Sequence, residues 1–319
     1  MRVARQFVKS CIESDARNGR TICKWWQDTV FYQIYPRSFC DSNGDGVGDI
    51  RGIVEKLDYI KWLGAGAIWL SPVYDSPNRD MGYDIRDYKR ILREYGTMQD
   101  FDLLLEEMHK RGLRLVMDMV VNHTSDEHPW FLASRSSRNS PYRDYYYWRP
   151  GKGDNPPNNW SSFFTPCAWK YDTITKEWYL HCFGENQPDL NWENPAVREE
   201  IYRMINWWLD RGVDGIRIDV VSLFAKNIDF PNATLRTSNY DGYVFPIEHI
   251  AFQPKLPGYL RELNARCLAG KDRVSIGEAT FVTTGNANTI VGEDMLDMVF
   301  QFELMELGNG EEKWEPHPY

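Results

Sequence analysis

Short apolar runs alternate with amphipathic stretches along most of this chain, and that alternation restricts its fold more than any other feature. The apolar runs, rich in β-branched and aromatic residues, cover 30–35, 67–70, 113–121, 215–221, 274–278 and 297–302. Apolar residues at three- and four-residue spacing predict helices over 53–63, 101–111, 196–211 and 258–268. Strands that alternate with helices in this way form a parallel sheet wrapped by helices.

Polar residues close several of the predicted strands. Asp118 and His123 lie near the end of the third strand, Asp219 ends the fourth and Glu278 ends the fifth. In parallel α/β folds, chemistry gathers at the carboxyl ends of strands. A (β/α)8 TIM barrel fits better than a doubly wound sheet, because these residues come from successive strands. Since eight strands are required and about six are found, we expect an incomplete barrel.

The segment 124–195 lacks periodicity and is rich in Asn, Pro, Ser, Tyr and Trp. A structureless loop of that length is rare in a compact domain, so an inserted subdomain that shapes a pocket is expected after the third strand. We therefore expect four parts along the chain: an N-terminal arm over 1–24, the first part of a barrel over 25–123, the inserted subdomain over 124–195, and the second part of the barrel over 196–319.

Charge and composition exclude several classes of partner. The net charge of −9 argues against nucleic acid, whose phosphates require clustered Lys and Arg. Without an apolar run of about 20 residues or a signal peptide, we expect no membrane contact and a cytoplasmic location. The six cysteines are scattered, which argues for reduced thiols. The many aromatic rings suit sugar faces, although most such rings simply pack.

Asp219 and Glu278 together provide what glycoside hydrolysis requires. One carboxylate must be ionised at the reacting sugar carbon, and the other must be protonated to release the leaving oxygen. Arg217, two residues before Asp219, would keep Asp219 ionised, while Glu278 in a drier pocket would hold its proton. The alternative for Arg217 and Asp219 is an ordinary salt bridge at the end of a strand.

Four short motifs resemble those of the α-amylase superfamily, in order and spacing. They are Asp118-Met-Val-Val-Asn-His123, Gly215-Ile-Arg-Ile-Asp219, Gly277-Glu278 and Gln187-Pro-Asp-Leu-Asn191. The last resembles a motif of the oligo-1,6-glucosidase and α-glucosidase branch, and the resemblance extends from about residue 25 to the end. It implies that Asp219 is the nucleophile and Glu278 the general acid/base, with Arg217 beside the nucleophile.

The resemblance also implies a closed pocket for the terminal glucose of an oligosaccharide. Its lining residues would be Asp80, Tyr83, His123, Phe183 and Gln187. For the two aromatic residues, core packing is the alternative. Val220 directly after the nucleophile resembles members that prefer α-1,6 bonds, so isomaltose-type substrates are favoured. Trehalose-6-phosphate hydrolases and dextran glucosidases remain alternatives.

The loop 41–49 offers alternating oxygen ligands. An EF-hand would require Glu at the twelfth position, which is Gly52, so that reading fails. The similar loop of the family implies a structural Ca²⁺ bound by Asp41, Asn43, Asp45, the Val47 carbonyl and Asp49. The alternative is a turn that binds nothing. No organic cofactor is expected.

Members of the family continue into two more strands, a His-Asp pair that contains a third catalytic Asp, and a C-terminal β-domain. We therefore expect the 319-residue chain to be inactive or nearly so alone. Two interpretations stay open: part of a complete α-glucosidase, or a non-catalytic remnant that at most binds sugar or a partner. The related heavy chains of amino-acid transporters are disfavoured, because both catalytic carboxylates are present. Oligomeric state is left open.

Overall fold

A six-stranded parallel sheet organises the computed structural model, which describes residues 24–234 and 242–305. The strands follow one another in space in the same order as in the chain: β1 (Phe31–Ile34), β2 (Ala67–Leu70), β5 (Arg114–Met119), β9 (Gly215–Ile218), β10 (Val274–Gly277) and β11 (Met298–Val299). The sheet is curled into half a barrel. The predicted incomplete (β/α)8 barrel with six strands is thus confirmed for the described residues. Most of the predicted N-terminal arm lies outside them.

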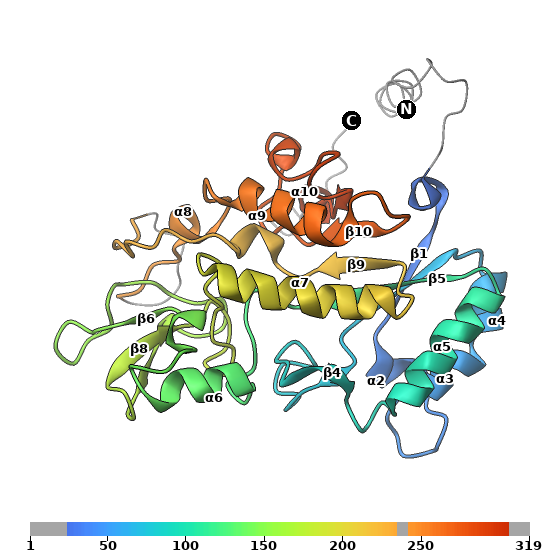
Figure 1. Cartoon of the computed structure of the whole chain (residues 1–319), viewed down its shortest axis with the longest axis horizontal. Helices are drawn as coiled ribbons and strands as arrows, with labels where there is room; N and C mark the ends of the chain where they lie inside the picture. The colour runs from blue at the N-terminus through green and yellow to red at the C-terminus, as the bar shows by residue number, and fades with distance from the viewer. Residues whose placement is uncertain (1–23, 235–241, 306–319) are drawn as a thin grey trace, which may run out of the picture.

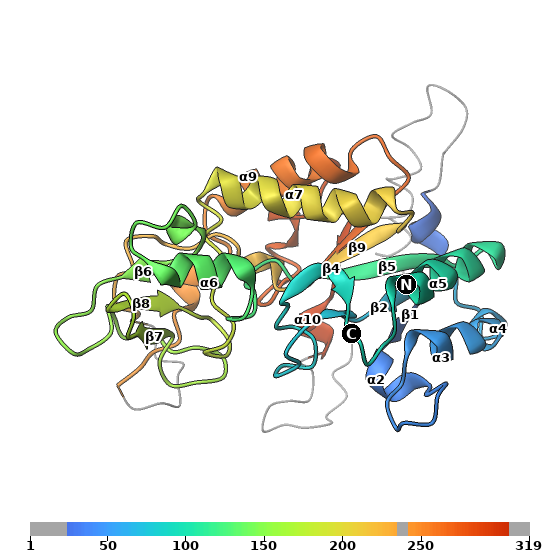
Figure 2. The same cartoon turned by 60° about the horizontal axis from the view of Figure 1, so that its bottom comes forward.

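Helices cover the outer face of the sheet. Figure 2 shows α7 and α9 beside each other over the strands, with α3, α4 and α5 at the other flank. The helices are α2 (Pro36–Phe39), α3 (Ile50–Glu55), α4 (Leu57–Trp62), α5 (Met98–Lys110), α6 (Pro129–Ser136), α7 (Pro195–Asp210), α8 (Ile247–Ile250), α9 (Leu256–Leu263) and α10 (Phe302–Met305). Short 3-10 turns are η1 (Trp25–Asp28), η2 (Arg143–Tyr145), η3 (Val221–Leu223) and η5 (Ala287–Thr289), and η4 (Asn264–Leu268) is a π-helical turn after α9.

One predicted helix is divided in two. The periodicity over 53–63 predicts a continuous helix, but Lys56 leaves the helical region with φ −101° and ψ 2° and separates α3 from α4. Its N–H bonds to the carbonyls of Ile53 and Val54, so the turn is tighter than an α-helical one. The apolar spacing continues across this break, because both short helices still turn the same face to the core.

Helix starts follow ordinary capping chemistry. Thr97 begins α5 with a capping box: its hydroxyl accepts from Asp100 N–H at 3.3 Å and Asp100 accepts from Thr97 N–H at 2.8 Å. Asn194 caps α7 by accepting from Ala196 N–H at 2.9 Å, and Pro195 occupies the first helical position.

A three-stranded antiparallel sheet forms outside the barrel, within the aperiodic segment after β5. It consists of β6 (Trp148–Arg149), β8 (Glu177–Leu180) and β7 (Trp169–Asp172), and Figure 1 shows it at one end of the molecule beside α6. These strands have their own hydrophobic cluster, which includes Trp160, Trp169 and Leu180. The hairpin β3 (Tyr74–Asp75) and β4 (Asp87–Ile91) also lies outside the barrel sheet and was not expected from the sequence. The proposed domain limits stay predictions.

None of the helices within 24–234 and 242–305 combines the length and apolarity needed to cross a lipid bilayer.

Gly277 allows β10 to approach its neighbours. A Cβ added there would lie 2.6 Å from a Leu296 methyl, 3.0 Å from one of Val221 and 3.2 Å from one of Val299. We predict that Gly277→Ala lowers the free energy of unfolding by about 1–3 kcal/mol through overpacking, measured by urea denaturation. Gly258→Ala in α9 is the matched control, since its Cβ would meet nothing within 4 Å. An equal loss in both variants would contradict this account.

Candidate active site

Three neighbouring strands bring the acidic residues to one edge of the sheet. Asp118 on β5 pairs in register with Arg217 on β9, and Ile218 pairs with Gly277 at the end of β10. Asp219 and Glu278 therefore follow their strands at the same level. Since side chains at alternate positions point to one face, Asp118, Arg217 and Asp219 project into the interior of the half-barrel.

The Arg217 guanidinium joins the three carboxylates. Nη1 contacts Asp118 Oδ1 and Asp219 Oδ1, each at 2.6 Å, and Nη2 contacts Glu278 Oε2 at 2.6 Å. Side-chain exposure is 0% for Asp118, 8% for Asp219 and 24% for Glu278, so Glu278 is the carboxyl that opens toward solvent. The two predicted catalytic carboxyls, those of Asp219 and Glu278, therefore bind the same guanidinium group.

Burial and opposite charge have opposing effects on the pKa values of the acidic residues in this cluster. Burial, aided by nearby Glu278 and Asp118, raises the pKa of Asp219 well above its usual range, although Arg217 lowers it. Burial also raises the pKa of Asp118 against the effect of Arg217. Arg217 does act in the expected direction on Asp219, since it favours the ionised form, but burial and the two neighbouring carboxyls act against it.

Asp118 received no role from the sequence, but its neighbours make it central. Its Oδ2 accepts hydrogen bonds from the Tyr83 hydroxyl at 3.0 Å and from the Trp69 indole at 3.1 Å. Asp118 thus connects Tyr83 to the Arg217 cluster. Its position in the same motif as His123 indicated that Asp118 could belong to the site. Spacing alone, however, could not distinguish a structural carboxylate from a catalytic one.

His123 is a neutral ring at the side of this cluster. Burial lowers its pKa to about 4. Nδ1 lies 3.2 Å from the Asn122 side-chain amide nitrogen, which can only donate, and Nε2 lies 3.1 Å from the Tyr83 carbonyl oxygen. These two partners favour a proton on Nε2, whereas the Gln187 side-chain nitrogen, 3.3 Å from Nε2, favours a proton on Nδ1. The ring centroid is 5.1 Å from that of Phe183.

Asp80 and Gln187 complete the predicted pocket. Gln187 Nε2 donates to Asp80 Oδ2 at 2.7 Å and lies 3.3 Å from His123 Nε2, while Gln187 Oε1 accepts from Gly184 N–H at 2.9 Å. All the residues predicted to catalyse or bind sugar therefore lie in one connected group. Their roles stay predictions.

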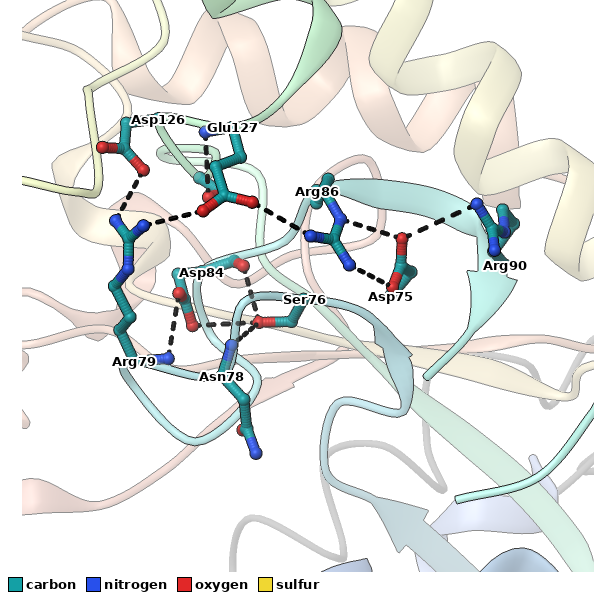
Figure 3. A network of polar contacts seen from close by, with 10 residues as sticks. Asp75, Ser76, Asn78, Arg79, Asp84, Arg86, Arg90, Asp126 and Glu127 are labelled. Carbon is teal, nitrogen blue, oxygen red and sulfur yellow. Dashed lines mark hydrogen bonds and ion pairs between the residues drawn. The ribbon is translucent and has the colours of Figure 1, made fainter. Parts of the chain in front are cut away.

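The loop that carries Asp80 and Tyr83 is held by a polar network. The fully buried Asp84 accepts from the backbone N–H groups of Arg79 and Asp80, each at 3.1 Å, and from the Ser76 hydroxyl at 3.0 Å. Figure 3 shows Glu127, at the start of the inserted segment, between the guanidinium groups of Arg79 and Arg86. This network ties the Asp80–Tyr83 loop to the insertion.

A buried ion pair that the sequence did not reveal lies behind His123. Lys226 Nζ lies 2.8 Å from Asp189 Oδ2, and both side chains are fully buried. Nζ also donates to Asn122 Oδ1 at 3.1 Å, and Asn122 in turn contacts His123. A lysine at the end of an apolar run gave no sign of this role.

The candidate metal loop lies between α2 and α3. Asp41 accepts from the backbone N–H groups of Asn43, Gly44 and Gly46, and the Gly46 and Gly44 donors lower its pKa. Asp49 caps α3 by accepting from Gly52 N–H at 2.7 Å and also binds Ser42. Across the described ranges, no three His, Cys, Asp or Glu side chains converge as metal ligands. A Ca²⁺ here would need the Asn43 and Val47 oxygens, which are hard ligands of the correct type.

Known proteins match the chain closely. It is 53% identical over 298 residues to an oligo-1,6-glucosidase of Bacillus cereus, a match covering 92% of this chain and 53% of that enzyme. An α-glucosidase of Pediococcus pentosaceus is 48% identical over 296 residues, covering 91% of this chain and 52% of that protein. The chain spans about half the length of the curated relatives it matches.

Solved structures agree with this result. Trehalose-6-phosphate hydrolase of Bacillus licheniformis superposes with a TM-score of 0.84 at 43% identity, covering 93% of this chain and 53% of that one. Trehalulose synthase of Pseudomonas mesoacidophila MX-45 gives 0.83 at 44% identity with the same coverage. The family model for the α-amylase catalytic domain matches residues 33–317. With nearly all of its length accounted for in this way, the chain belongs to the α-amylase family.

Proposed function

We propose that the protein is a retaining α-glucosidase that removes terminal α-linked glucose from oligosaccharides. The observation that carries this proposal is that the carboxyls of Asp219 and Glu278 bind the same guanidinium, which keeps them close together. Retaining glycosidases need two carboxyls about 5–5.5 Å apart. The oligo-1,6-glucosidases at about 50% identity support the same activity.

In the proposed reaction, Asp219 attacks the anomeric carbon while Glu278 protonates the leaving oxygen. A β-glucosyl ester forms on Asp219, and Glu278 then takes a proton from the water that hydrolyses it. Neutral His123, with Asp80, Tyr83 and Gln187, would hold the glucose hydroxyls.

Linkage preference is proposed to favour α-1,6 bonds. Val220 after the nucleophile and the names of the relatives support this choice. Trehalose-6-phosphate hydrolase and trehalulose synthase share the fold at 43–44% identity, so the fold alone does not determine which glycosidic linkage is cleaved. Rates on isomaltose, maltose, sucrose and trehalose 6-phosphate would rank the alternatives. If the full protein hydrolyses none of these four substrates, the result would favour the interpretation as a non-catalytic remnant.

Asp219→Asn is predicted to lower kcat on isomaltose more than about a thousandfold, because the amide cannot form the glucosyl ester. The measurement is glucose release by the full protein. Glu106→Gln, a charge removal on the exposed face of α5, is the control and should retain activity. Near-normal turnover by Asp219→Asn on an aryl α-glucoside would refute the nucleophile assignment.

Glu278→Gln is predicted to discriminate between leaving groups. For isomaltose, whose leaving alkoxide needs a proton, kcat/KM should fall by about 10²–10⁴-fold. For 2,4-dinitrophenyl α-glucoside, whose leaving group needs none, kcat/KM should change little. Equal losses on the two substrates would mean that Glu278 is not the acid.

We also propose that the 41–49 loop binds Ca²⁺ and that the ion fixes the loop without taking part in chemistry. The sequence of this loop supports the proposal, since carboxylate, amide and carbonyl oxygens are the ligands that a hard cation prefers, although its three carboxylates do not converge in the described structure. Ca²⁺ at a hundred times its Kd should stabilise the protein by about 2.7 kcal/mol, seen as a raised Tm that EDTA reverses. Asp45→Ala should abolish the shift and Glu106→Gln should keep it. An unchanged Tm in the unsubstituted protein would exclude the site.

A further inference from the structure

Val220, directly after Asp219, has a left-handed backbone with φ 38° and ψ 43°. Side chains branched at Cβ rarely adopt this conformation, because Cβ crowds the following carbonyl. Among the described non-glycine residues with positive φ, which also include Asn78, Met81 and Phe230, Val220 alone is β-branched. Such an outlier beside a nucleophile calls for a cause.

The left-handed turn directs two successive N–H groups at one residue. Val220 N–H donates to the Glu278 carboxyl, Oε2, at 3.2 Å, and Val221 N–H donates to the Glu278 carbonyl at 2.8 Å. In an extended strand, consecutive N–H groups point to opposite sides, so a continued β9 could not make both contacts. Consecutive N–H groups that converge at a turn form a concavity suited to an anion.

The side chain of Val220 anchors this turn from the other side. It is 7% exposed and belongs to the hydrophobic cluster of the inserted segment, together with Tyr147, Leu223 and Phe230. Asp219 N–H still bonds to the Met119 carbonyl at 3.0 Å, so the sheet fixes the residue before the turn. The strained residue is therefore held between the barrel and the insertion.

We propose that Val220 is a positioning residue: its anchored side chain keeps the strained turn that holds the Glu278 carboxyl beside Asp219. The inference rests on the proposed function, and it assigns the main chain of Val220 a role separate from any effect of its side chain on linkage. Through this residue the inserted segment affects the position of the proposed acid/base, Glu278.

Strain at position 220 is tested by thermal unfolding, independently of activity. Gly tolerates positive φ and Ala does not, so Val220→Gly should melt about 1–4 °C above Val220→Ala. At the neighbouring Val221, the Gly variant should melt below the Ala variant, as at an ordinary position. A Val220→Gly protein that melts below Val220→Ala, or fails to fold while Val220→Ala folds, would overturn the proposal.

Positioning is tested by the leaving-group comparison in the full protein. The α-hydroxy acid analogue of valine at position 220 replaces the N–H by oxygen and keeps the side chain, so folding should survive. It should lower kcat/KM for isomaltose at least about tenfold and that for 2,4-dinitrophenyl α-glucoside less than about twofold. Equal losses, or none, would refute the role of Val220. An unsubstituted protein that cleaves neither substrate would instead refute the proposed function, while the melting comparison would still stand.

Discussion

The site depends on the ion pairs of one guanidinium, that of Arg217, with the carboxylates of Asp118, Asp219 and Glu278. Removing charges from water costs several kcal/mol per ion, and that cost is offset only where partners are well placed. The placement comes from β5, β9 and β10, whose parallel register sets the three strand ends at one level. A slip of one residue in β9 would turn Arg217 and Asp219 to the helix-covered face, where no carboxylate cluster would compensate them.

The conformation of Val220 shows how packing supports strain at this site. A left-handed β-branched residue costs about 1–3 kcal/mol, and burying a valine side chain contributes about 1.5–3 kcal/mol. The two terms are of similar size, so the turn persists because the cluster around Trp160 and Phe230 accepts the side chain. Without that cluster the strain would have no compensation, which links the stability of the inserted segment to the geometry at Glu278.

Much of the fold could be predicted from the sequence, because the spacing of apolar residues and the polar residues at strand ends are local signals. The strand over 67–70 was predicted at its observed limits, and Asp219 and Glu278 were identified from their positions after apolar runs. Long-range contacts were not accessible. Lys226 and Asp189 are 37 positions apart in the chain, and Asp118 gains its role from Tyr83 and Trp69 on other elements. The meeting of three carboxylates at one guanidinium also escaped prediction, because it depends on the register of three strands.

The segment that bears His123 and the loop that bears Asp80 and Tyr83 are held by interactions of different strength. Breaking the buried pair of Lys226 and Asp189 would leave an uncompensated charge at a cost of about 3–5 kcal/mol, so the segment that bears His123 is firmly fixed. Arg79 and Glu127 are 46% and 38% exposed, and such pairs contribute about 0–1 kcal/mol and weaken with salt. The Asp80–Tyr83 loop therefore relies mainly on the hydrogen bonds of buried Asp84. Of the two segments, the Asp80–Tyr83 loop is therefore the one expected to open locally at the lower free-energy cost.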